Sequence, residues 1–379
     1  MSRTRRRVRV VIWLIFLLVV LAFLAYQFRS KEEFRHFEWE KFAAAFRQAG
    51  KGYLAAAVLA ILLTYVIRAW RWQCFSRPAK PLRFTAVLAA TWAGFSAVML
   101  LGRAGELIRP VMIARKEAVA VSSMMAVWAV ERIFDTLTVV VLLAGVLALS
   151  PTALVMNGPD SPAARVVRQA GVLVTLAALA GAGLLWSYRA KPERLGGLVR
   201  WLHRFLPARW HSGVDRALRS FEDGLKFLQR PRELLVSVLY SFALWFVICL
   251  GYWLVCQALG DEMARLPATA VVILVFFAMA GSTVQVPGVG GGFQAATIIA
   301  LTALYHIEVE VAASASILLW VITFCVVLSL GIPVLVHEGW SLRQLRQIAA
   351  EQETRPACGR QASDLLEEDR LKAKVGTAL

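Results

Sequence analysis

The sequence predicts an all-α protein that crosses a membrane several times. Hydrophobic residues make up 59% of the 379 residues, and the mean hydropathy is +0.61, well above soluble globular proteins. Apolar runs of about 20 residues, the length of a bilayer-spanning helix, recur along the chain. The formal net charge is +17, but Lys and Arg gather between these runs and not in a basic patch with interleaved aromatics. A soluble enzyme and a nucleic-acid-binding protein are therefore both disfavoured.

Six uninterrupted apolar runs predict spanning helices. The first follows the basic residues 1–9, which places the N-terminus in the cytoplasm. No small-residue cleavage site follows it, so we interpret this run as a membrane helix and not as a signal peptide. The six predicted spans are residues 10–26, 53–67, 118–150, 170–186, 234–259 and 312–336.

Two further apolar runs, 84–112 and 268–304, contain breaks, GRAGELIRP in the first and VPGVGGGFQ in the second. The loops 68–83 and 189–233 are basic and therefore predicted to be cytoplasmic. If run 84–112 crossed the membrane, Arg115 and Lys116 would lie outside, so we predict a hairpin that enters and leaves on the cytoplasmic side. The same reasoning makes run 268–304 a hairpin that enters from the outer side.

The predicted fold is therefore six spanning helices plus two opposed re-entrant hairpins. Paired broken segments of this kind indicate an inverted-repeat transporter with a site near the bilayer midplane. The alternative is that each broken run is one kinked spanning helix whose glycines serve close packing. Residues 1–337 would form the membrane domain, and the charged tail 338–379 would be cytoplasmic and partly disordered.

Two amphipathic stretches are predicted to lie outside the bilayer. Residues 34–46 place four phenylalanines near one helical face, which favours an interfacial helix on the outer surface. In loop 189–233, apolar residues recur at spacings of three or four between 210 and 228 beside basic ones, which predicts a helix lying on anionic lipid. Packing of this helix on the membrane domain is the alternative, because amphipathicity does not name the partner.

Six ionisable residues lie inside the apolar runs. A charge at the centre of a membrane helix costs about 2.5–3.5 kcal/mol, so such residues pair with one another and mark a substrate or ion route. A salt-bridge network that only fixes helix packing is the alternative, although buried ion pairs are a poor source of stability. The six residues are Arg103, Glu106 and Arg109 in GRAGELIRP, and Glu131, Arg132 and Asp135 in WAVERIFDTL.

These three cations and three anions sum to zero when all are ionised. An anionic ligand would then need one carboxylate to take up a proton, so we predict that phosphate binding is linked to proton uptake. The expected phosphate-binding residues are Arg103, Arg109 and Arg132. The residues expected to couple protons or balance charge are Glu106, Glu131 and Asp135.

The glycine-rich break in the second run suggests an anion seat. Pro287 would end one half-helix, and the following glycines would let the backbone turn. The next half-helix would present free N–H groups to the cavity, and Gln294 would add a hydrogen bond without charge. A simple glycine-mediated helix crossing is the alternative. The predicted binding residues are Gly290, Gly291 and Gln294, and the predicted hinge is Pro287, Gly288 and Gly292.

Catalytic and metal-binding patterns are not found in the sequence. The five histidines are scattered, there is no H-E-x-x-H or nucleophile elbow, and the five cysteines form no C-x-x-C pair. We therefore expect no metal, no cofactor and no enzymatic activity.

The motifs GRAGELIRP, VERIFD and PGVGGGFQ, in this order and spacing, resemble the flippase-like family that includes the transmembrane region of lysylphosphatidylglycerol synthases. The resemblance runs from about residue 10 to residue 336. It implies a protein that handles lipids, in some members moving an aminoacylated phospholipid between leaflets and elsewhere associated with polyprenyl-linked sugars.

Two of the family's motifs are intact in this sequence. They fall on Gly102, Arg103, Gly105, Glu106 and Arg109, and on Glu131, Arg132 and Asp135. The third motif departs from the pattern, because Val289 replaces a glycine and Gln294 replaces an acid, which favours hydrogen bonding over an ion role at Gln294. The aminoacyl-transfer domain of the synthases is not found in the sequence, so synthesis of lysyl-lipid is not expected.

The predicted function is an inner-membrane lipid translocase with both termini in the cytoplasm. Its substrate would be a phosphate-bearing lipid of the phospholipid or polyprenyl-phosphate type. The main alternative is a non-transporting membrane subunit that binds lipid or a glycosyltransferase and regulates it. A membrane-embedded enzyme acting on polyprenyl phosphate is a third possibility, for which a divalent-metal requirement would be diagnostic.

Overall fold

The computed structural model describes residues 37–78, 80–149, 226–283, 285–286 and 290–339, with scattered positions between 172 and 225. The predicted span 10–26, most of the tail, Pro287 and Gly288 lie outside these residues, as does most of the predicted amphipathic helix in loop 189–233.

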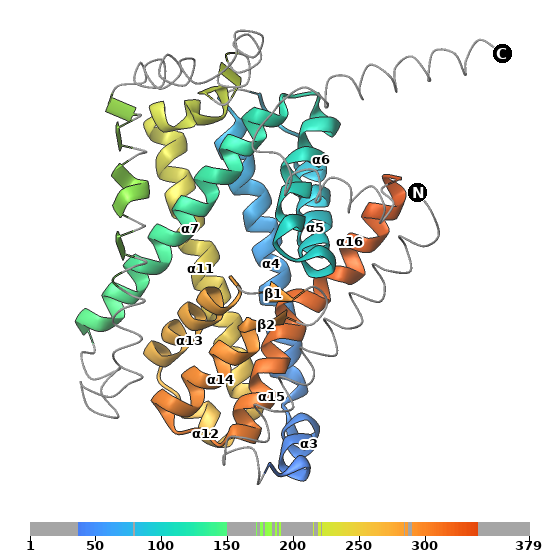
Figure 1. The fold of residues 1–379 in the computed structure, drawn as a ribbon, viewed down its shortest axis with the longest axis vertical. Helices are drawn as coiled ribbons and strands as arrows, with labels where there is room; N and C mark the ends of the chain where they lie inside the picture. The colour runs from blue at the N-terminus through green and yellow to red at the C-terminus, as the bar shows by residue number, and fades with distance from the viewer. Residues whose placement is uncertain are drawn as a thin grey trace, which may run out of the picture.

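Long apolar helices dominate the described part of the chain (Figure 1). They are α4 (Lys51–Ser76), α5 (Phe84–Leu101), α7 (Val121–Leu149), α11 (Pro231–Leu259) and the continuous series α15 (Val309–Trp320), the π-helical turn η5 (Val321–Cys325) and α16 (Val326–His337). Within the described residues, α4, α5, α11 and the segment Val309–His337 are long and apolar enough to cross a membrane. The protein is therefore an all-helical, multi-pass membrane protein.

Helix α4 is longer than the sequence predicts. The prediction ended the span at residue 67 and began a cytoplasmic loop at Arg68, but the helix continues to Ser76. This boundary was wrong because Arg68 and Arg71 find carboxylate partners inside the protein, so their charges do not end the helix. The 26 residues make α4 about 39 Å long.

The first broken run folds back on itself as α5, η1 (Gly102–Leu107) and α6 (Ile108–Glu117), here called the first hairpin. Helix α5 ends at Gly102, whose φ of +68° favours glycine. A Cβ on Gly105 would lie 2.3 Å from the backbone of Ala97, so only glycine permits this approach. At the open end, Arg83 Nε donates to Glu117 Oε1 at 2.9 Å, so both flanks of the run lie together, and their place on the cytoplasmic side stays a prediction.

The second broken run also folds back, as α13 (Ala268–Gly281) and α14 (Gly292–Tyr305), here called the second hairpin. Its tip is a short antiparallel pair of β1 (Gln285–Val286) and β2 (Gly290–Gly291). Gly291 has a φ of +78° directly before α14, so the predicted glycine turn is present at this position. Strand β1 contacts η1, and the tips of the two hairpins therefore meet (Figure 1).

The two ends of the helix bundle differ in their contacts. At one end, α3 (Trp39–Gln48) and α12 (Asp261–Ala264) lie near the start of α15 (Figure 1). The Glu38 backbone N–H donates to Glu310 Oε1 at 3.1 Å there. Helix α3 overlaps the predicted 34–46 stretch and ends two residues after it, and its position at a membrane surface stays a prediction. At the opposite end, Lys116 Nζ pairs with Glu338 Oε1 at 2.6 Å.

Buried apolar side chains form two clusters. One surrounds the second hairpin and includes Tyr65, Val139 and Trp245. The other surrounds the first hairpin and includes Trp72 and Phe134, together with residues at the other end of α4 and α7.

The short helix η4 (Lys226–Gln229) also joins the cluster around the first hairpin. Its Phe227 ring lies 4.7 Å from that of Phe75. This end of the predicted amphipathic helix therefore packs on the membrane domain, which was the stated alternative to lipid contact.

Candidate functional site: a buried arginine–carboxylate cluster

The charged residues of α4, α6 and α7 meet at the boundary between the two apolar clusters. Glu131 is fully buried and Asp135 is 3% exposed. On α7 they lie between Val130 of one cluster and Val139 of the other. Glu131 is ten residues into α7, about 15 Å from its start at 1.5 Å per residue. The cluster is therefore deep inside the helical bundle.

Arg71 on α4 bridges the two carboxylates. Its Nη2 donates to Glu131 Oε1 at 2.9 Å, and its Nη1 donates to Asp135 Oδ1 at 2.7 Å and to Ser241 Oγ on α11 at 3.0 Å. Trp245 on α11 also donates to Asp135 Oδ1, at 3.4 Å. One fully buried guanidinium thus holds both carboxylates on the same face of α7, the face that their spacing predicts.

Arg68 lies one turn before Arg71 and reaches the same carboxylates more loosely. Its Nη1 is 3.8 Å from Glu131 Oε1 and 3.7 Å from Asp135 Oδ2. The guanidinium lies 5.0 Å from the centre of the Phe95 ring, and the side chain is 11% exposed.

Sequence reasoning missed Arg68 and Arg71 because it assigned them to a loop. A usable signal was present: the two arginines are spaced i,i+3 within the apolar, aromatic stretch TYVIRAWRWQ, a spacing that puts both on one helical face.

Arg109 on α6 is enclosed on all sides. Its Nη2 donates to Glu131 Oε2, and its guanidinium lies 4.5 Å from the ring centre of Trp72 and 5.6 Å from that of Phe95. The residue is 4% exposed. Arg109 was predicted to bind phosphate, but a ligand reaches it only after this packing rearranges.

Arg132 is the most exposed of these four arginines, with 39% of its side chain accessible. Its Nη2 lies 3.1 Å from Asp135 Oδ2 and 3.4 Å from Glu131 Oε2, so the predicted i,i+3 pair with Asp135 is present. Its Nη1 lies 3.9 Å from Oε2 of Glu106, which lies in η1 at the tip of the first hairpin. Arg132 therefore brings the two charged motifs of the sequence, GRAGELIRP and WAVERIFDTL, together in space. The side chain of Arg103 lies outside the described part of the structure, and its role stays a prediction.

The charge balance of the cluster differs from the predicted sum of zero. Arg68 and Arg71 join it, so the described side chains comprise four arginines against Glu106, Glu131 and Asp135. One positive charge is in excess among these described side chains when all are ionised. The predicted set of three cations lacked Arg68 and Arg71 and included Arg103, whose side chain lies outside the described part of the structure.

Several arginine donors in the cluster make no hydrogen bond to any residue that the structure describes. They are Nε of Arg68, Arg71 and Arg132 and Nη1 of Arg109, all buried. A buried donor without an acceptor costs free energy, so the protein retains polar groups here that an anionic ligand can satisfy.

The second hairpin contributes its tip and not a charge to this region. Gly290 and Gly291 form β2, Gly292 begins α14, and Gln294 lies in the first turn of that helix. The adjoining β1 contacts η1, which carries Glu106. In the described ranges, no group of three His, Cys, Asp or Glu side chains is arranged to hold a metal ion.

A bundle of apolar helices enclosing an ionic cluster defines a polytopic membrane protein with a buried polar site. The chain belongs to the family described as the lysylphosphatidylglycerol synthase TM region, whose model matches residues 10–331. The resemblance carried by the three motifs is thereby confirmed, and the protein is related to membrane proteins of lipid modification and transport. No curated protein and no solved structure matches the chain.

Proposed function

We propose that the protein moves a phosphate-bearing lipid, a phospholipid or a polyprenyl phosphate, between the leaflets of the inner membrane. The observation that carries the proposal is the excess positive charge of the buried cluster, with Arg132 accessible at its edge. The cluster lies about 15 Å along α7, half the roughly 30 Å hydrocarbon core. Charges at such depth are retained for substrate or ion passage more readily than for stability.

Arg132 is the proposed first contact for the lipid phosphate. A phosphate oxygen takes the place of Glu106 Oε2, which lies 3.9 Å from Arg132 Nη1. Arg68 then serves as the second cation that binds the phosphate. Arg71 and Arg109 hold Glu131 and Asp135 in place. Arg103, Gly290, Gly291 and Gln294 complete the proposed site from the two hairpin tips.

Both hairpins are proposed to be re-entrant, entering from opposite faces, within the six-span arrangement predicted above. The 14-residue arms of the second hairpin are about 21 Å long, which is too short to cross the bilayer. Rearrangement at the hinge Pro287, Gly288 and Gly292 would separate the tips and open a path. The end of the bundle that carries Arg77, Lys80, Arg83, Lys116 and Arg230 is proposed to be cytoplasmic.

We also propose that proton uptake is coupled to phosphate binding, in a cluster that already carries a positive excess. The positive excess lets the cluster accept a single negative charge without prior protonation, so proton uptake modulates binding and is not required for it. Glu106, Glu131 and Asp135 are together the residues proposed to couple protons or balance charge. Affinity of the purified protein for a lipid phosphate that stays constant across the pH range of carboxylate titration would contradict this role.

The test of the function is leaflet exchange in proteoliposomes, using head-group-labelled phospholipids and a polyprenyl phosphate. Wild-type protein should accelerate exchange, and Arg132→Gln should slow it more than tenfold, because a charge-assisted hydrogen bond is worth about 1.5–3 kcal/mol. Arg77→Gln, which removes an exposed arginine at the bundle end, is the matched control and should exchange like wild type.

Exchange by Arg132→Gln at the wild-type rate would remove the cluster from the transport route. If folded wild-type protein exchanges no lipid, the translocase proposal fails. The alternative, a regulatory membrane subunit, then takes its place, and the next experiment is a search for a partner such as a glycosyltransferase.

A further inference from the structure

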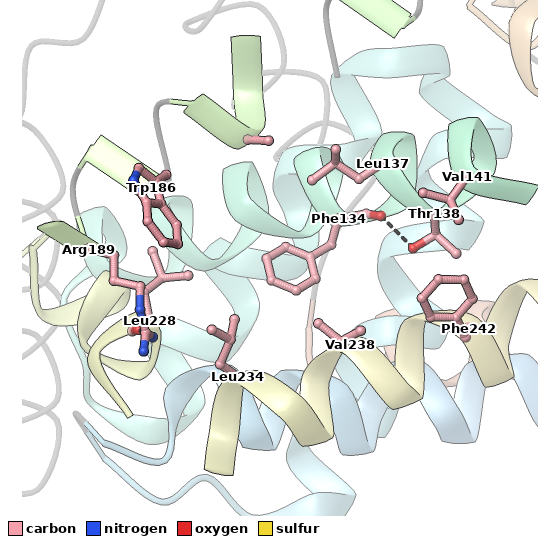
Figure 2. A pocket seen from close by; sticks show the side chains of 11 residues that line it. Phe134, Leu137, Thr138, Val141, Trp186, Arg189, Leu228, Leu234, Val238 and Phe242 are labelled. Carbon is pink, nitrogen blue, oxygen red and sulfur yellow. Dashed lines mark hydrogen bonds between the residues drawn. The ribbon is translucent and has the colours of Figure 1, made fainter. Parts of the chain in front are cut away.

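A groove lined mainly by apolar side chains lies outside the arginine–carboxylate cluster, on the other side of α7. Figure 2 shows a groove between α7 and α11, closed on a third side by the segment that carries Trp186 and Arg189. Its volume is about 240 Å³, and Phe134, Val141, Val238 and Phe242 are among the side chains that line it. Thr138 Oγ1 donates to the Phe134 carbonyl at 2.8 Å, so the hydroxyl in the lining is satisfied within its own helix. The groove thus presents an apolar slot.

The groove is distinct from the arginine–carboxylate cluster. On α7, Phe134, Leu137 and Val141 are spaced three and four apart along one helical face. At 100° per residue, Arg132 projects about 160° away from Phe134 and about 180° away from Val141. A ligand of the groove therefore does not contact the proposed phosphate site.

One end of the groove is positively charged. Arg189 Nη1 donates to the carbonyl of Leu228, which fixes the guanidinium at the end where η4 leads into α11. A guanidinium has five N–H donors, so this bond leaves others for a ligand. Trp186, beside it in Figure 2, is 72% exposed. An exposed tryptophan next to an arginine is the composition expected where lipid head groups meet acyl chains.

We propose that this groove holds one acyl chain of an anionic phospholipid from the surrounding bilayer, with the lipid phosphate paired to Arg189. The slot and the charge fit the two halves of such a molecule: an apolar chain follows α7 and α11 toward Val141, and the head group stays at the basic end. This lipid is bound at the lipid-facing surface of the helix bundle and is not the transported substrate.

Quenching of Trp186 by brominated lipids tests the proposal. Full-length protein is reconstituted in phosphatidylcholine vesicles that contain either phosphatidylglycerol or phosphatidylcholine with brominated acyl chains. The Trp186 signal is the difference between wild type and Trp186→Phe. Brominated phosphatidylglycerol should half-quench it at a mole fraction about fivefold lower than brominated phosphatidylcholine, the preference that one basic residue at a membrane surface supplies.

Arg189→Gln should abolish this preference, whereas Arg230→Gln, an exposed arginine at the same end, should keep it. Val238→Phe, which fills the slot, should reduce quenching by both lipids. Equal quenching by the two lipids in wild type, or a preference that survives in Arg189→Gln, would overturn the proposal. Arg132→Gln should leave the preference intact, so failure of the groove is distinguishable from failure of the transport site.

Discussion

The two hairpins share a construction and differ in charge. Each has a glycine at positive φ at one end of its turn, Gly102 directly after α5 in the first and Gly291 directly before α14 in the second. Each brings its parts together at a glycine where a Cβ would lie 2.3 Å from backbone atoms, Gly105 and Gly281. Yet the first hairpin carries Glu106 and Arg109 into the ionic cluster, whereas the described tip of the second is uncharged.

This difference indicates that the two hairpins have different mechanical roles in the site. The first hairpin is tied to α7 by the ion pairs of Arg109 with Glu131 and of Glu106 with Arg132. In a low-dielectric interior, breaking such a pair leaves a buried charge without its partner. The second hairpin is held by apolar packing and by the short β1–β2 backbone pairing. Breaking these contacts leaves no buried charge without a partner. We therefore expect the first hairpin to be the fixed half of the site and the second to be the half that moves.

The largest effect is expected from Glu131→Gln. Glu131 lies within 4.0 Å of four arginines, Arg68, Arg71, Arg109 and Arg132, so neutralising it leaves buried guanidinium groups without their shared carboxylate. We expect a loss of about 3–5 kcal/mol in stability, measured by thermal unfolding in detergent. Asp223→Asn is the control, because its pair with Lys226 is exposed on both sides, and it should lose less than about 1 kcal/mol.

Equal melting of Glu131→Gln and wild type would mean that ion pairing does not fix the first hairpin. The proposed division between the hairpins would then lose its physical basis.

A smaller and equal effect is expected from Gly105→Ala and Gly281→Ala. In both hairpins the new methyl group overlaps backbone atoms, and such overpacking costs about 1–3 kcal/mol. Gly145→Ala on α7 is the matched control, because its Cβ would meet no atom within 4 Å and alanine is the better helix former. Melting temperatures of the three variants check this, and a hairpin variant that melts like Gly145→Ala would show that its arms do not pack as described.

The smallest effect is expected where each hairpin meets its neighbours at the ends of the bundle. Glu117, 6% exposed, accepts a hydrogen bond from Arg83 across the open end of the first hairpin. Glu117→Gln should lower stability by roughly 1 kcal/mol, the upper range for a pair with one exposed partner. Glu308, which follows the second hairpin, pairs with Lys41 at 3.3 Å on the surface, so Glu308→Gln should melt like wild type. A larger loss in Glu308→Gln than in Glu117→Gln would reverse the expected order of the two hairpins.

Much of the architecture was determined by the sequence itself. Apolar runs of bilayer length predicted a multi-pass helical protein, and the positions of glycine predicted where two of those runs turn back. These features are local: hydropathy and the conformational freedom of glycine act within a few residues of chain, so they can be recognised without knowing the packing. The three motifs likewise identified the family.

The composition of the site was decided by the tertiary structure. Arg71 meets Glu131 and Asp135 across 60 and 64 residues of sequence, and Arg132 on α7 meets Glu106 on the first hairpin. Local charge patterns placed Arg68 and Arg71 in a loop, because an arginine at the end of an apolar run looks like a membrane border until its partner is known. Which charges pair, and whether a positive charge is left over, depends on how the helices are rotated and packed against one another, and only the fold sets that.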